Sequence, residues 1–479
     1  MSVKIDRQID ELLTCTPEVE VRQIIGDSRV SVSEITHDSS KVSKGAFFCC
    51  IVGENFDGHD FAKAAVANGA VALLVERRVE TDATQVVVGD ARLAMGYLAA
   101  ELCGRPSRKL NLVGVTGTNG KTTTTHLLSA ILKQHGWVTS VIGTLTGART
   151  TPESPDLQKF LRHELDQGCD AVVMEVSSHA LSLRRVEGTS FKAAIFTNLG
   201  QDHLDFHKSI EDYFSAKARL FDEQFTNICI INRDDVHGSL LIDLVSNKTQ
   251  LKCETFGIDD AVDVKADASK ISFTWRGEKI EMTMGGHFNV MNALAAATAA
   301  AKLGVTTSDI AKGLATASAV PGRFEPVNEG QNFSVIIDYA HTPEALKNVL
   351  LAARQLVNHT ERVILVFGCG GGRDQSKRPK MGATAATFAD VVYITSDNPR
   401  QENAMNIAEE ILSGVATTAM NVKIELDRRQ AMASAFKLAN AGDIVVIAGK
   451  GHETLQSIGD VDLPFNDAEV SRELLKAAS

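Results

Sequence analysis

The sequence predicts an α/β protein built from three domains, and three observations carry this prediction. From about residue 107 onward, short apolar runs alternate with helical segments, which is the pattern of parallel sheets covered by helices. The chain has 479 residues, which exceeds the size at which one hydrophobic core keeps growing. Nearly every apolar run ends in a glycine or polar cluster. Because ligands bind at the carboxyl ends of strands in open parallel sheets, we expect these clusters to line two facing rims.

Nine apolar runs are the predicted strands of a central and a C-terminal sheet: residues 110–115, 138–143, 171–176, 193–198 and 228–232, then 334–338, 362–368, 391–396 and 443–449. One domain boundary is predicted near residues 89 and 90, where a helical segment begins, and another at the Pro and Gly break from Pro321 to Phe324. The expected domains are a small N-terminal α/β recognition domain (1–89), a central domain with a mostly parallel sheet (90–321) and a Rossmann-like α/β domain (322–479).

Composition limits the classes of partner. Hydrophobic residues make up 44% and charged residues 23%, and the formal net charge of −11 disfavours nucleic acid or an anionic membrane as the main partner. The eight cysteines show no CxxC pair or metal-ligand spacing, so we expect reduced core residues. An early charged N-terminus and the lack of an apolar run of about 18 residues argue against a signal peptide and a membrane span. We expect a cytoplasmic monomer that acts on small molecules.

The segment 114–128, GVTGTNGKTTTTHLL, is the most informative of the chain, because an apolar run breaks into glycines and then becomes amphipathic. Gly117 and Gly120 let backbone amides face an anion, and the helix N-terminus adds a positive dipole. Lys121 can reach terminal phosphates, and a threonine hydroxyl can hold Mg²⁺. Val115 stands where the strict GxxxxGK[ST] pattern has its first glycine. The segment predicts a phosphate loop, with a glycine turn and a surface lysine as the alternative.

Polar residues also follow the neighbouring strands. Glu175 ends a continuous apolar run, where a carboxylate either ligates a metal or caps the next segment. With a phosphate loop one strand away, metal ligation is favoured, because Mg²⁺ selects carboxylate, hydroxyl and phosphate oxygens. The stretch 201–207 is either part of the same site or a solvated polar turn; it contains Asp202, His203, Asp205 and His207.

Lys217 lies on the apolar side of a predicted helix, on the same face as Tyr213, Phe214, Leu220 and Phe221. Snorkelling of the side chain toward water is the ordinary explanation for such a lysine. A desolvated lysine, however, has a lowered pKa, and its neutral amine can take up CO₂ to form a carbamate, which is an anionic metal ligand.

The segment from Gly286 places Asn289 and Asn292 three residues apart at the start of a helix, with His287 just before them. These side chains could face an adenine, and capping of the helix by Asn289 is the alternative. After the second boundary, Arg323, Asp338, Tyr339 and His341 stand at or beside strand ends. Asp338 could accept a hydrogen bond from a ribose hydroxyl, and Arg323 could neutralise a phosphate.

Three further strand ends of the C-terminal sheet carry Arg373, Asn398 with Arg400, and Glu453. Two guanidinium groups, an amide and a carboxylate suit a zwitterion, because arginine binds carboxylates and glutamate binds an ammonium group. Each residue alone is more often part of an ordinary polar surface, whereas the set predicts an amino-acid pocket.

A series of motifs makes the chain similar to the Mur ligases over nearly all of its length: TGTNGKTTT, TTPES, EVSSHAL, TNLGQDHLDFH, YFSAKARLF, GHFNVMNALAA, VPGRFE, DYAHTPEAL, FGCGGGRDQSKRP, SDNPR and GKGHE, in family order. The resemblance implies ATP-dependent amide ligation through an acyl phosphate. It implies that meso-2,6-diaminopimelate is added to UDP-N-acetylmuramoyl-L-alanyl-D-glutamate in peptidoglycan precursor synthesis. ATP and Mg²⁺ are the implied cofactors.

The resemblance also implies a role for each site residue. ATP would be bound by Gly117, Thr118, Asn119, Gly120, Lys121, Thr122, Thr123, His287, Asn289, Asn292, Arg323 and Asp338. Metal would be held by Thr122, Glu175, His203 and a carbamylated Lys217, and the catalytic set would be Lys121, Glu175, His203 and Lys217. The UDP dipeptide would contact Thr150, Thr151, Ser177 and Arg185, with Ser39 near the uridine. The incoming amino acid would be bound by Arg373, Asp397, Asn398, Pro399, Arg400, Gly449 and Glu453.

Two positions depart from the family pattern. Leu183 stands where some members have a glutamine that contacts the dipeptide, and residues 401–406 read QENAMN instead of acidic residues followed by proline. Three alternatives to the implied function stay open. They are a Mur ligase that adds L-lysine, a ligase like folylpolyglutamate synthetase, and a P-loop NTPase that binds a partner without ligating anything.

Overall fold

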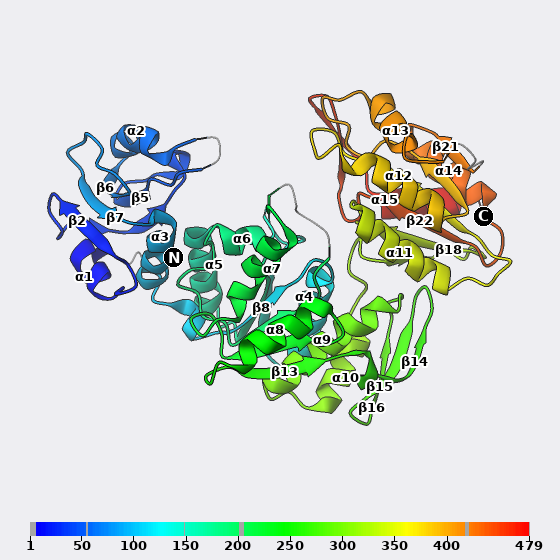
Figure 1. Ribbon diagram of the computed structural model, residues 1–479, viewed down its shortest axis with the longest axis horizontal. Coiled ribbons are helices and arrows are strands. Elements are labelled where there is room, and N and C mark those ends of the chain that lie inside the picture. The colour runs from blue at the N-terminus through cyan, green and yellow to red at the C-terminus, as the bar shows by residue number, and fades with distance from the viewer. Residues whose placement is uncertain (1–5, 54–55, 148, 201–205, 417–420, 479) are drawn as a thin grey trace.

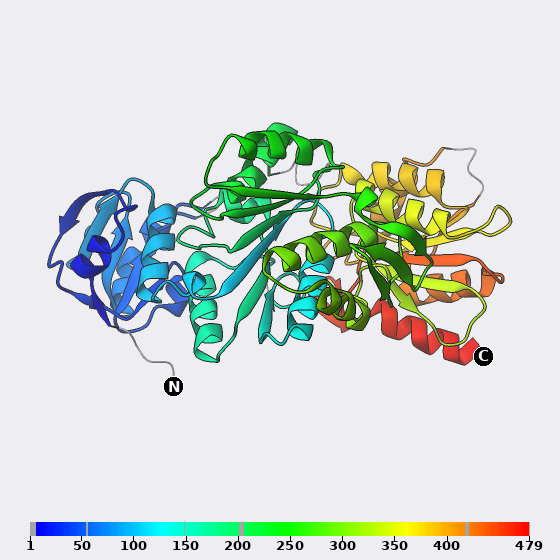
Figure 2. The same ribbon diagram turned by 90° about the horizontal axis from the view of Figure 1, so that it is seen from below.

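The computed structural model describes residues 6–53, 56–147, 149–200, 206–416 and 421–478. Figure 1 shows three α/β units that follow one another in chain order, from the first domain in blue through the central domain to the C-terminal domain in yellow and red. Figure 2, turned by 90°, shows the same succession. The predicted fold class is therefore confirmed. No helix within the described ranges is long and apolar enough to cross a membrane.

The first domain is a five-stranded sheet in the order β2-β7-β6-β5-β4, parallel except for β2. Its elements are β1 (Arg7–Gln8), α1 (Ile9–Thr14), β2 (Val21–Ile25), β3 (Ser31–Val32), β4 (Glu34–Thr36), β5 (Ala46–Cys49), α2 (Ala62–Ala67), β6 (Ala70–Val75) and β7 (Thr84–Val88). The next helix, α3 (Ala91–Leu102), buries Met95 and Leu98 in the same cluster as Phe47 and Leu74 of this sheet. The boundary near residue 89 stays a prediction, and the packing of α3 favours a junction after Leu102.

The central domain holds six parallel strands in the order β13-β12-β11-β8-β10-β9. The strands are β8 (Asn111–Thr116), β9 (Thr139–Ile142), β10 (Ala171–Glu175), β11 (Ala193–Phe196), β12 (Ile228–Asn232) and β13 (Lys252–Phe256). The helices are α4 (Lys121–Gln134), α5 (Ser154–Asp166), α6 (Ser178–Ser182), α7 (Ile210–Ala218), α8 (Val236–Ser246), α9 (Phe288–Lys302) and α10 (Thr307–Thr316).

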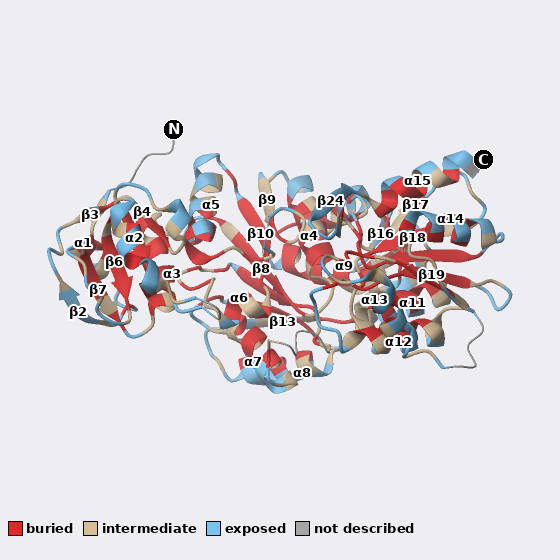
Figure 3. Cartoon of the chain, turned by 90° about the horizontal axis from the view of Figure 1, so that it is seen from above, coloured by how far each residue is buried: buried red, intermediate tan, exposed pale blue. Residues whose placement is uncertain are grey.

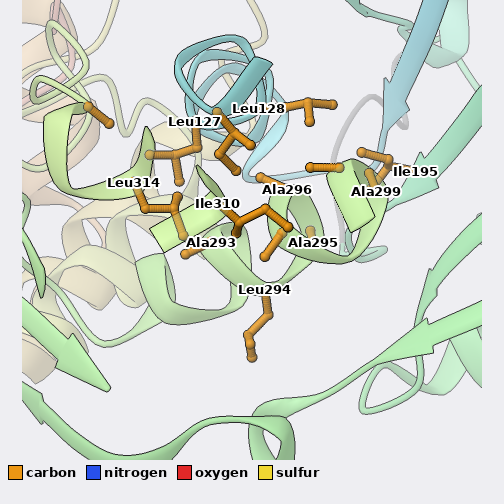
Figure 4. Packing of buried hydrophobic residues seen from close by; sticks show 14 of the residues in the cluster. Leu127, Leu128, Ile195, Ala293, Leu294, Ala295, Ala296, Ala299, Ile310 and Leu314 are labelled. Carbon is orange, nitrogen blue, oxygen red and sulfur yellow. The ribbon is translucent and has the colours of Figure 1, made fainter. Parts of the chain in front are cut away.

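Both faces of this sheet are covered, as expected for parallel strands with apolar residues throughout. Val113 and Val115 of β8 belong to one hydrophobic cluster with α4, α9 and α10, whereas Leu112 belongs to a second cluster with α5, α7 and α8. Figure 3 shows the strands buried over most of their length. Figure 4 shows Leu127 and Leu128 of α4 beside the alanines of α9, whose small side chains let the helices approach closely.

A three-stranded antiparallel sheet was not predicted. It consists of β14 (Val262–Ala266), β15 (Ile271–Trp275) and β16 (Glu278–Met282), in that order. Alternate residues of β15, including Phe273 and Trp275, complete the cluster around α9 and α10. The sheet therefore closes one face of the central domain.

The C-terminal domain has a six-stranded sheet in the order β17-β18-β22-β19-β20-β21, parallel except for β17. The strands are β17 (Glu325–Val327), β18 (Ser334–Asp338), β19 (Val363–Phe367), β20 (Val391–Ile394), β21 (Val422–Ile424) and β22 (Ile444–Ala448), with a hairpin of β23 (Leu455–Ile458) and β24 (Val461–Pro464). The helices are α11 (Pro343–Gln355), α12 (Lys377–Phe388), α13 (Ala404–Leu412), α14 (Arg428–Leu438) and α15 (Asp467–Ala478). All nine strands predicted from the sequence are present.

Candidate active site

The loop between β8 and α4 is shaped by glycine. Gly117 and Gly120 adopt φ values of 150° and 84°, in the region that favours glycine. A Cβ at Gly117 would overlap the hydroxyl of Thr197, and a Cβ at Gly120 would overlap Oδ1 of Asn292. Gly120 is also the N-cap of α4, so the loop ends at the positive end of a helix dipole. The loop therefore has the form of an anion cradle.

Lys121 and the next strand end complete this cradle. The Lys121 Nζ donates to the carbonyls of Gly117 and Thr118, both at 2.8 Å. The backbone amide of Asn119 donates to Oδ1 of Asn198 at 2.9 Å, and the amide of Thr118 donates to the Asn198 carbonyl at the same distance. The end of β11 thus supports the loop, and the ammonium group is held at its mouth.

Glu175 and Thr122, two of the residues predicted to be metal ligands, lie together. The Glu175 side chain is buried and accepts hydrogen bonds from the Thr122 hydroxyl at 3.0 Å and the Thr144 amide at 2.8 Å. Within the described ranges, no group of three His, Cys, Asp or Glu residues could hold a metal. A hydroxyl and one carboxylate beside a phosphate cradle fit Mg²⁺, which takes oxygen ligands and completes its shell with phosphates and water. The predicted ligand His203 lies outside the described residues.

Lys217 is buried beneath the loop, with 1% of its surface exposed. Its Nζ donates to the Gly117 carbonyl at 2.8 Å and lies 4.5 Å from the ring centroid of Tyr213. The hydroxyl of Tyr213 lies 3.1 Å from that of Thr118. Snorkelling therefore does not describe this side chain, because its amine points into the site and away from water.

The residues predicted to bind the nucleotide come from both the central and the C-terminal domain. Asn292 donates to Asn289 at 2.8 Å, and Asn289 donates back to the Gly285 carbonyl, so Asn289 does not cap the helix. Asp338 accepts from the amides of Phe324 and Ala340. Burial raises the pKa of the Asp338 carboxyl, and the nearby Arg323 opposes this shift.

Arg323 keeps a buried donor without a hydrogen-bond partner. Its guanidinium lies 4.7 Å from the ring centroid of Tyr339, and its Nε is buried without a hydrogen-bond partner. A cavity of about 1110 Å³, which we call the inter-domain cavity, is lined by the phosphate loop and Glu175 on one side and by Arg323, Asp338 and Tyr339 on the other. The expectation of two facing rims is confirmed.

Four predicted contacts to the UDP dipeptide line the inter-domain cavity: Thr150, Thr151, Ser177 and Arg185. The Thr151 hydroxyl donates to the Glu175 carbonyl at 2.9 Å and accepts from the Ser177 amide at 3.1 Å. Ser39 is not among the lining residues and begins a single 3₁₀ turn of the first domain that is capped by Asp38.

A group of three arginines around one carboxylate was missed by sequence reasoning. Glu153 is buried and pairs with Arg149 at 2.7 Å, with Arg185 at 2.8 Å and with Arg92 at 3.6 Å. Arg92 belongs to α3, so the group joins α3 to the central domain. Three guanidinium groups against one carboxylate leave excess positive charge beside the cavity, which suits an anionic ligand.

A second cavity of about 990 Å³, the C-terminal cavity, contains most of the predicted amino-acid pocket. Its lining includes Arg373, Asp397, Asn398, Arg400, Gly449 and Glu453, whereas Pro399 is not among the lining residues. Asn398 donates to Glu453 at 2.7 Å. Arg400 has a φ of 52°, and its guanidinium donates to the Gly371 carbonyl at 2.5 Å.

Lys450 lies behind this cavity and was not singled out from the sequence. It is fully buried and donates to Oδ1 of Asn398 at 3.0 Å and to Glu453 at 3.1 Å. Burial raises the pKa of Asp397, while Arg428 and Lys450 oppose the shift. The place of Lys450 inside the GKGHE motif was the available signal. Its burial, however, depends on Asn398, which is distant in the chain.

The two departures from the family pattern have defined structures. Leu183 is the C-cap of α6, its side chain carries no amide, and it is not among the residues that line the inter-domain cavity. In the segment 401–406, Glu402 accepts from the Gly372 amide at 2.5 Å, and Oδ1 of Asn403 caps α13 by accepting from the Met405 amide at 2.8 Å. The altered segment therefore still contacts the glycine loop and still starts the next helix.

Substitution Gly120→Ala is expected to lower the thermal unfolding midpoint clearly more than Gly136→Ala. Both glycines have positive φ, 84° and 96°, so alanine strains either backbone by roughly 1–2 kcal/mol. Only the Cβ at position 120 meets another group, Oδ1 of Asn292, whereas nothing lies within 4 Å at position 136. Overpacking adds about 1–3 kcal/mol. Equal shifts of the two variants in scanning calorimetry would contradict this packing of loop against α9.

Comparison with known proteins gives a consistent result. Three family models match the chain: "Mur ligase family, catalytic domain" at residues 31–100, "Mur ligase middle domain" at 115–300 and "Mur ligase, glutamate ligase domain" at 322–451. Among curated relatives, the UDP-N-acetylmuramoyl-L-alanyl-D-glutamate--2,6-diaminopimelate ligase of Syntrophomonas wolfei is 43% identical over 469 residues, covering 93% of this chain and 95% of the relative. The protein of the same name from Geobacillus kaustophilus is also 43% identical, covering 92% and 94%.

Solved structures agree with the sequence relatives. A structure titled as a UDP-N-acetylmuramoyl-L-alanyl-D-glutamate--2,6-diaminopimelate ligase superposes with a TM-score of 0.71 at 31% identity, covering 99% of both chains. MurF from Acinetobacter baumannii superposes with a TM-score of 0.64 at 21% identity, again over 99% of both chains. The second likeness shows the fold alone.

Proposed function

This chain belongs to the Mur ligase family. We propose that it joins meso-2,6-diaminopimelate to UDP-N-acetylmuramoyl-L-alanyl-D-glutamate and cleaves ATP to ADP and phosphate in the process. The relatives named above carry this activity in their names. One structural observation supports it most directly: the inter-domain cavity and the C-terminal cavity adjoin. Tyr339, His341 and Arg373 line both. A carboxylate activated in the first cavity therefore lies next to an amine bound in the second.

The proposed reaction has two steps. The terminal carboxylate of the dipeptide attacks the γ-phosphorus of ATP, ADP leaves, and an acyl phosphate forms. The amine of diaminopimelate then attacks the acyl carbon, inorganic phosphate leaves, and the amine gives up a proton as the amide forms. Lys121 and the backbone amides of the phosphate loop stabilise charge on the transferring phosphoryl group, so the protein acts mainly by positioning and electrostatics.

The metal set proposed for this site is Thr122, Glu175, His203 and the carbamate of Lys217. Bound Mg²⁺ would neutralise phosphate charge. The carbamate would form when the neutral Lys217 amine adds to CO₂ and releases a proton. Burial of this amine under the loop supports the assignment, because a carbamate turns a buried cation into an anion suited to metal.

The remaining cavity residues are assigned by charge. Arg323 and Asp338 would engage phosphate and ribose from the side of the cavity opposite the phosphate loop. Asn289 and Asn292 would engage the nucleotide from the same side as the loop; of the two, Asn292 lines the cavity, and the fully buried Asn289 accepts its hydrogen bond. Thr150, Thr151, Ser177 and Arg185 would hold the dipeptide end of the UDP substrate, with Ser39 near the uridine. Arg373 and Arg400 would bind the carboxylates of diaminopimelate, and Glu453 an ammonium group.

An ADP-release assay with each substrate omitted in turn tests this function. Repeated release of ADP should need ATP, the UDP dipeptide and the amino acid together, because the acyl phosphate needs the first two and further turnover needs the third. ATP turnover that needs neither the dipeptide nor an amino acid would instead indicate a P-loop NTPase. Activity with a folate and glutamate would indicate a ligase like folylpolyglutamate synthetase.

A further inference from the structure

We propose that the ion cluster of Arg378, Glu402 and Glu410 positions the two arginine-bearing loops of the C-terminal cavity, so that Arg378 governs affinity for the incoming amino acid without touching it. The inference depends on the function proposed above. The two loops are the glycine loop, residues 368–373, which ends in Arg373, and the arginine loop, residues 396–402, which contains Arg400.

Arg378 is fully buried near the start of α12 and does not line the cavity. Its guanidinium forms a two-pronged contact with Glu402, with distances of 2.9 and 3.1 Å to the two carboxylate oxygens. It also donates to Glu410 of α13 at 2.8 Å and to the Gly370 carbonyl at 3.2 Å. One side chain therefore holds a helix, the glycine loop and the arginine loop together.

Glu402 also links the two loops directly, because it belongs to the arginine loop and contacts the glycine loop. The same carboxylate that binds Arg378 accepts from the Gly372 amide at 2.5 Å. The hydrogen bond from Arg378, followed by that from Gly372, lowers the pKa of Glu402, so the carboxylate stays ionised and the pair stays charged at neutral pH. Glu402 lies two residues after Arg400, and Gly372 lies immediately before Arg373. The pair thus fixes the distance between the two loops at the point where each presents its cation.

The two loops are in close contact, so a change in their spacing disturbs several contacts at once. A Cβ at Gly371 would overlap the Pro399 carbonyl, and the Gly371 amide donates to the Asn398 carbonyl at 2.9 Å. Arg400 in turn donates to the Gly371 carbonyl and holds a φ of 52°. Each contact between the loops thus depends on their spacing. A small shift would misplace both cations relative to a ligand with two carboxylates, and misplacement by about 1 Å can cost a hundredfold in rate.

Arg378→Lys is the test, because lysine keeps the positive charge but cannot form the two-pronged contact. The KM for diaminopimelate should rise about tenfold or more, while the KM for ATP stays within about twofold. Arg362→Lys is the matched control. Arg362 binds the buried Asp443 with two guanidinium nitrogens at 2.7 and 3.1 Å, but at the amino ends of β19 and β22, opposite the cavity. The control should leave both KM values unchanged even if its melting temperature falls equally.

Glu402→Gln provides a second route if the lysine variant fails to fold. It should reproduce the selective rise in KM, and the double variant should be no worse than the more affected single one, because both substitutions break the same contact. An unchanged KM for diaminopimelate, or equal rises for diaminopimelate and ATP, would overturn the proposal. Hydrogen exchange separates it from the proposed function: faster exchange in residues 368–373 and 396–402, with residues 111–120 unaffected, is expected whatever amino acid the wild type uses. Unchanged exchange in both loops would count against the positioning role.

Discussion

Replacing Lys217 with alanine is expected to lower kcat by about 100- to 1000-fold, the loss typical when one group that stabilises transition-state charge is removed. The amine is buried directly beneath the phosphate loop, on the Gly117 carbonyl, so no water-exposed residue can take its place. Added formate or acetate should restore part of the activity, because a small carboxylate can occupy the vacated space and supply the oxygens of the carbamate. The measurement is the rate of ADP release with and without the added acid.

Two further variants make this result specific. Lys217→Arg keeps a cation but cannot form the carbamate, so it should be as inactive as the alanine variant. Lys192→Ala removes an exposed lysine of the same domain and should behave as the wild type. Rescue of the Lys217→Ala variant by an added acid requires a folded protein. It therefore shows that the variant lost a catalytic group and not its fold. Full activity in either position-217 variant would remove the carbamate from the mechanism.

Arg400→Ala is expected to raise the KM for diaminopimelate by roughly 30-fold or more. Truncating one partner of a buried charge pair costs about 2–5 kcal/mol, and the lower value corresponds to this factor. Diaminopimelate differs from lysine by a second carboxylate at its far end, and Arg400 lines the C-terminal cavity where that carboxylate would bind. The KM for ATP should change little, because Arg400 does not line the inter-domain cavity. Steady-state kinetics with each substrate varied in turn gives both values.

The same variant should lose selectivity as well as affinity. Lysine brings no carboxylate to Arg400, so the low kcat/KM for lysine should be the same in the wild type and the variant. Because kcat/KM for diaminopimelate falls, the ratio of the two values should approach one. Arg429→Ala, which breaks an exposed pair with Glu473 in the same domain, is the control and should leave the ratio unchanged. A variant at position 400 that kept the wild-type ratio would transfer the selecting role to Arg373.

The parts of this protein that the sequence predicted are those set by short-range constraints. Continuous apolar runs with glycine or polar ends identified all nine strands expected, and parallel pairing then placed their ends on common rims. The phosphate loop was predicted because glycines in a strand-to-helix turn admit few other uses. Glu175 and Thr122 met at 3.0 Å because β10 lies beside β8.

The parts that were missed depend on contacts across long stretches of chain. Lys450 and Arg378 were not singled out from the sequence, because their burial depends on Asn398 and Glu402, which are distant in the chain. The strands β14 and β16 are partly exposed, and their mixed polar and apolar residues gave a weak signal. The pairing of Arg92 with Glu153 joins α3 to the central domain, which no local pattern reports. His203 lies outside the described residues, so its place in the metal set stays a prediction.

The central claim is that this ligase adds diaminopimelate, and the most direct test compares the two amino acids on the wild-type protein. ADP release would be measured with saturating ATP and UDP-N-acetylmuramoyl-L-alanyl-D-glutamate while meso-2,6-diaminopimelate or L-lysine is varied. We expect kcat/KM for diaminopimelate to exceed that for lysine by about a hundredfold or more, because lysine leaves the guanidinium of Arg400 without its carboxylate. Equal efficiency with both, or a preference for lysine, would contradict the account.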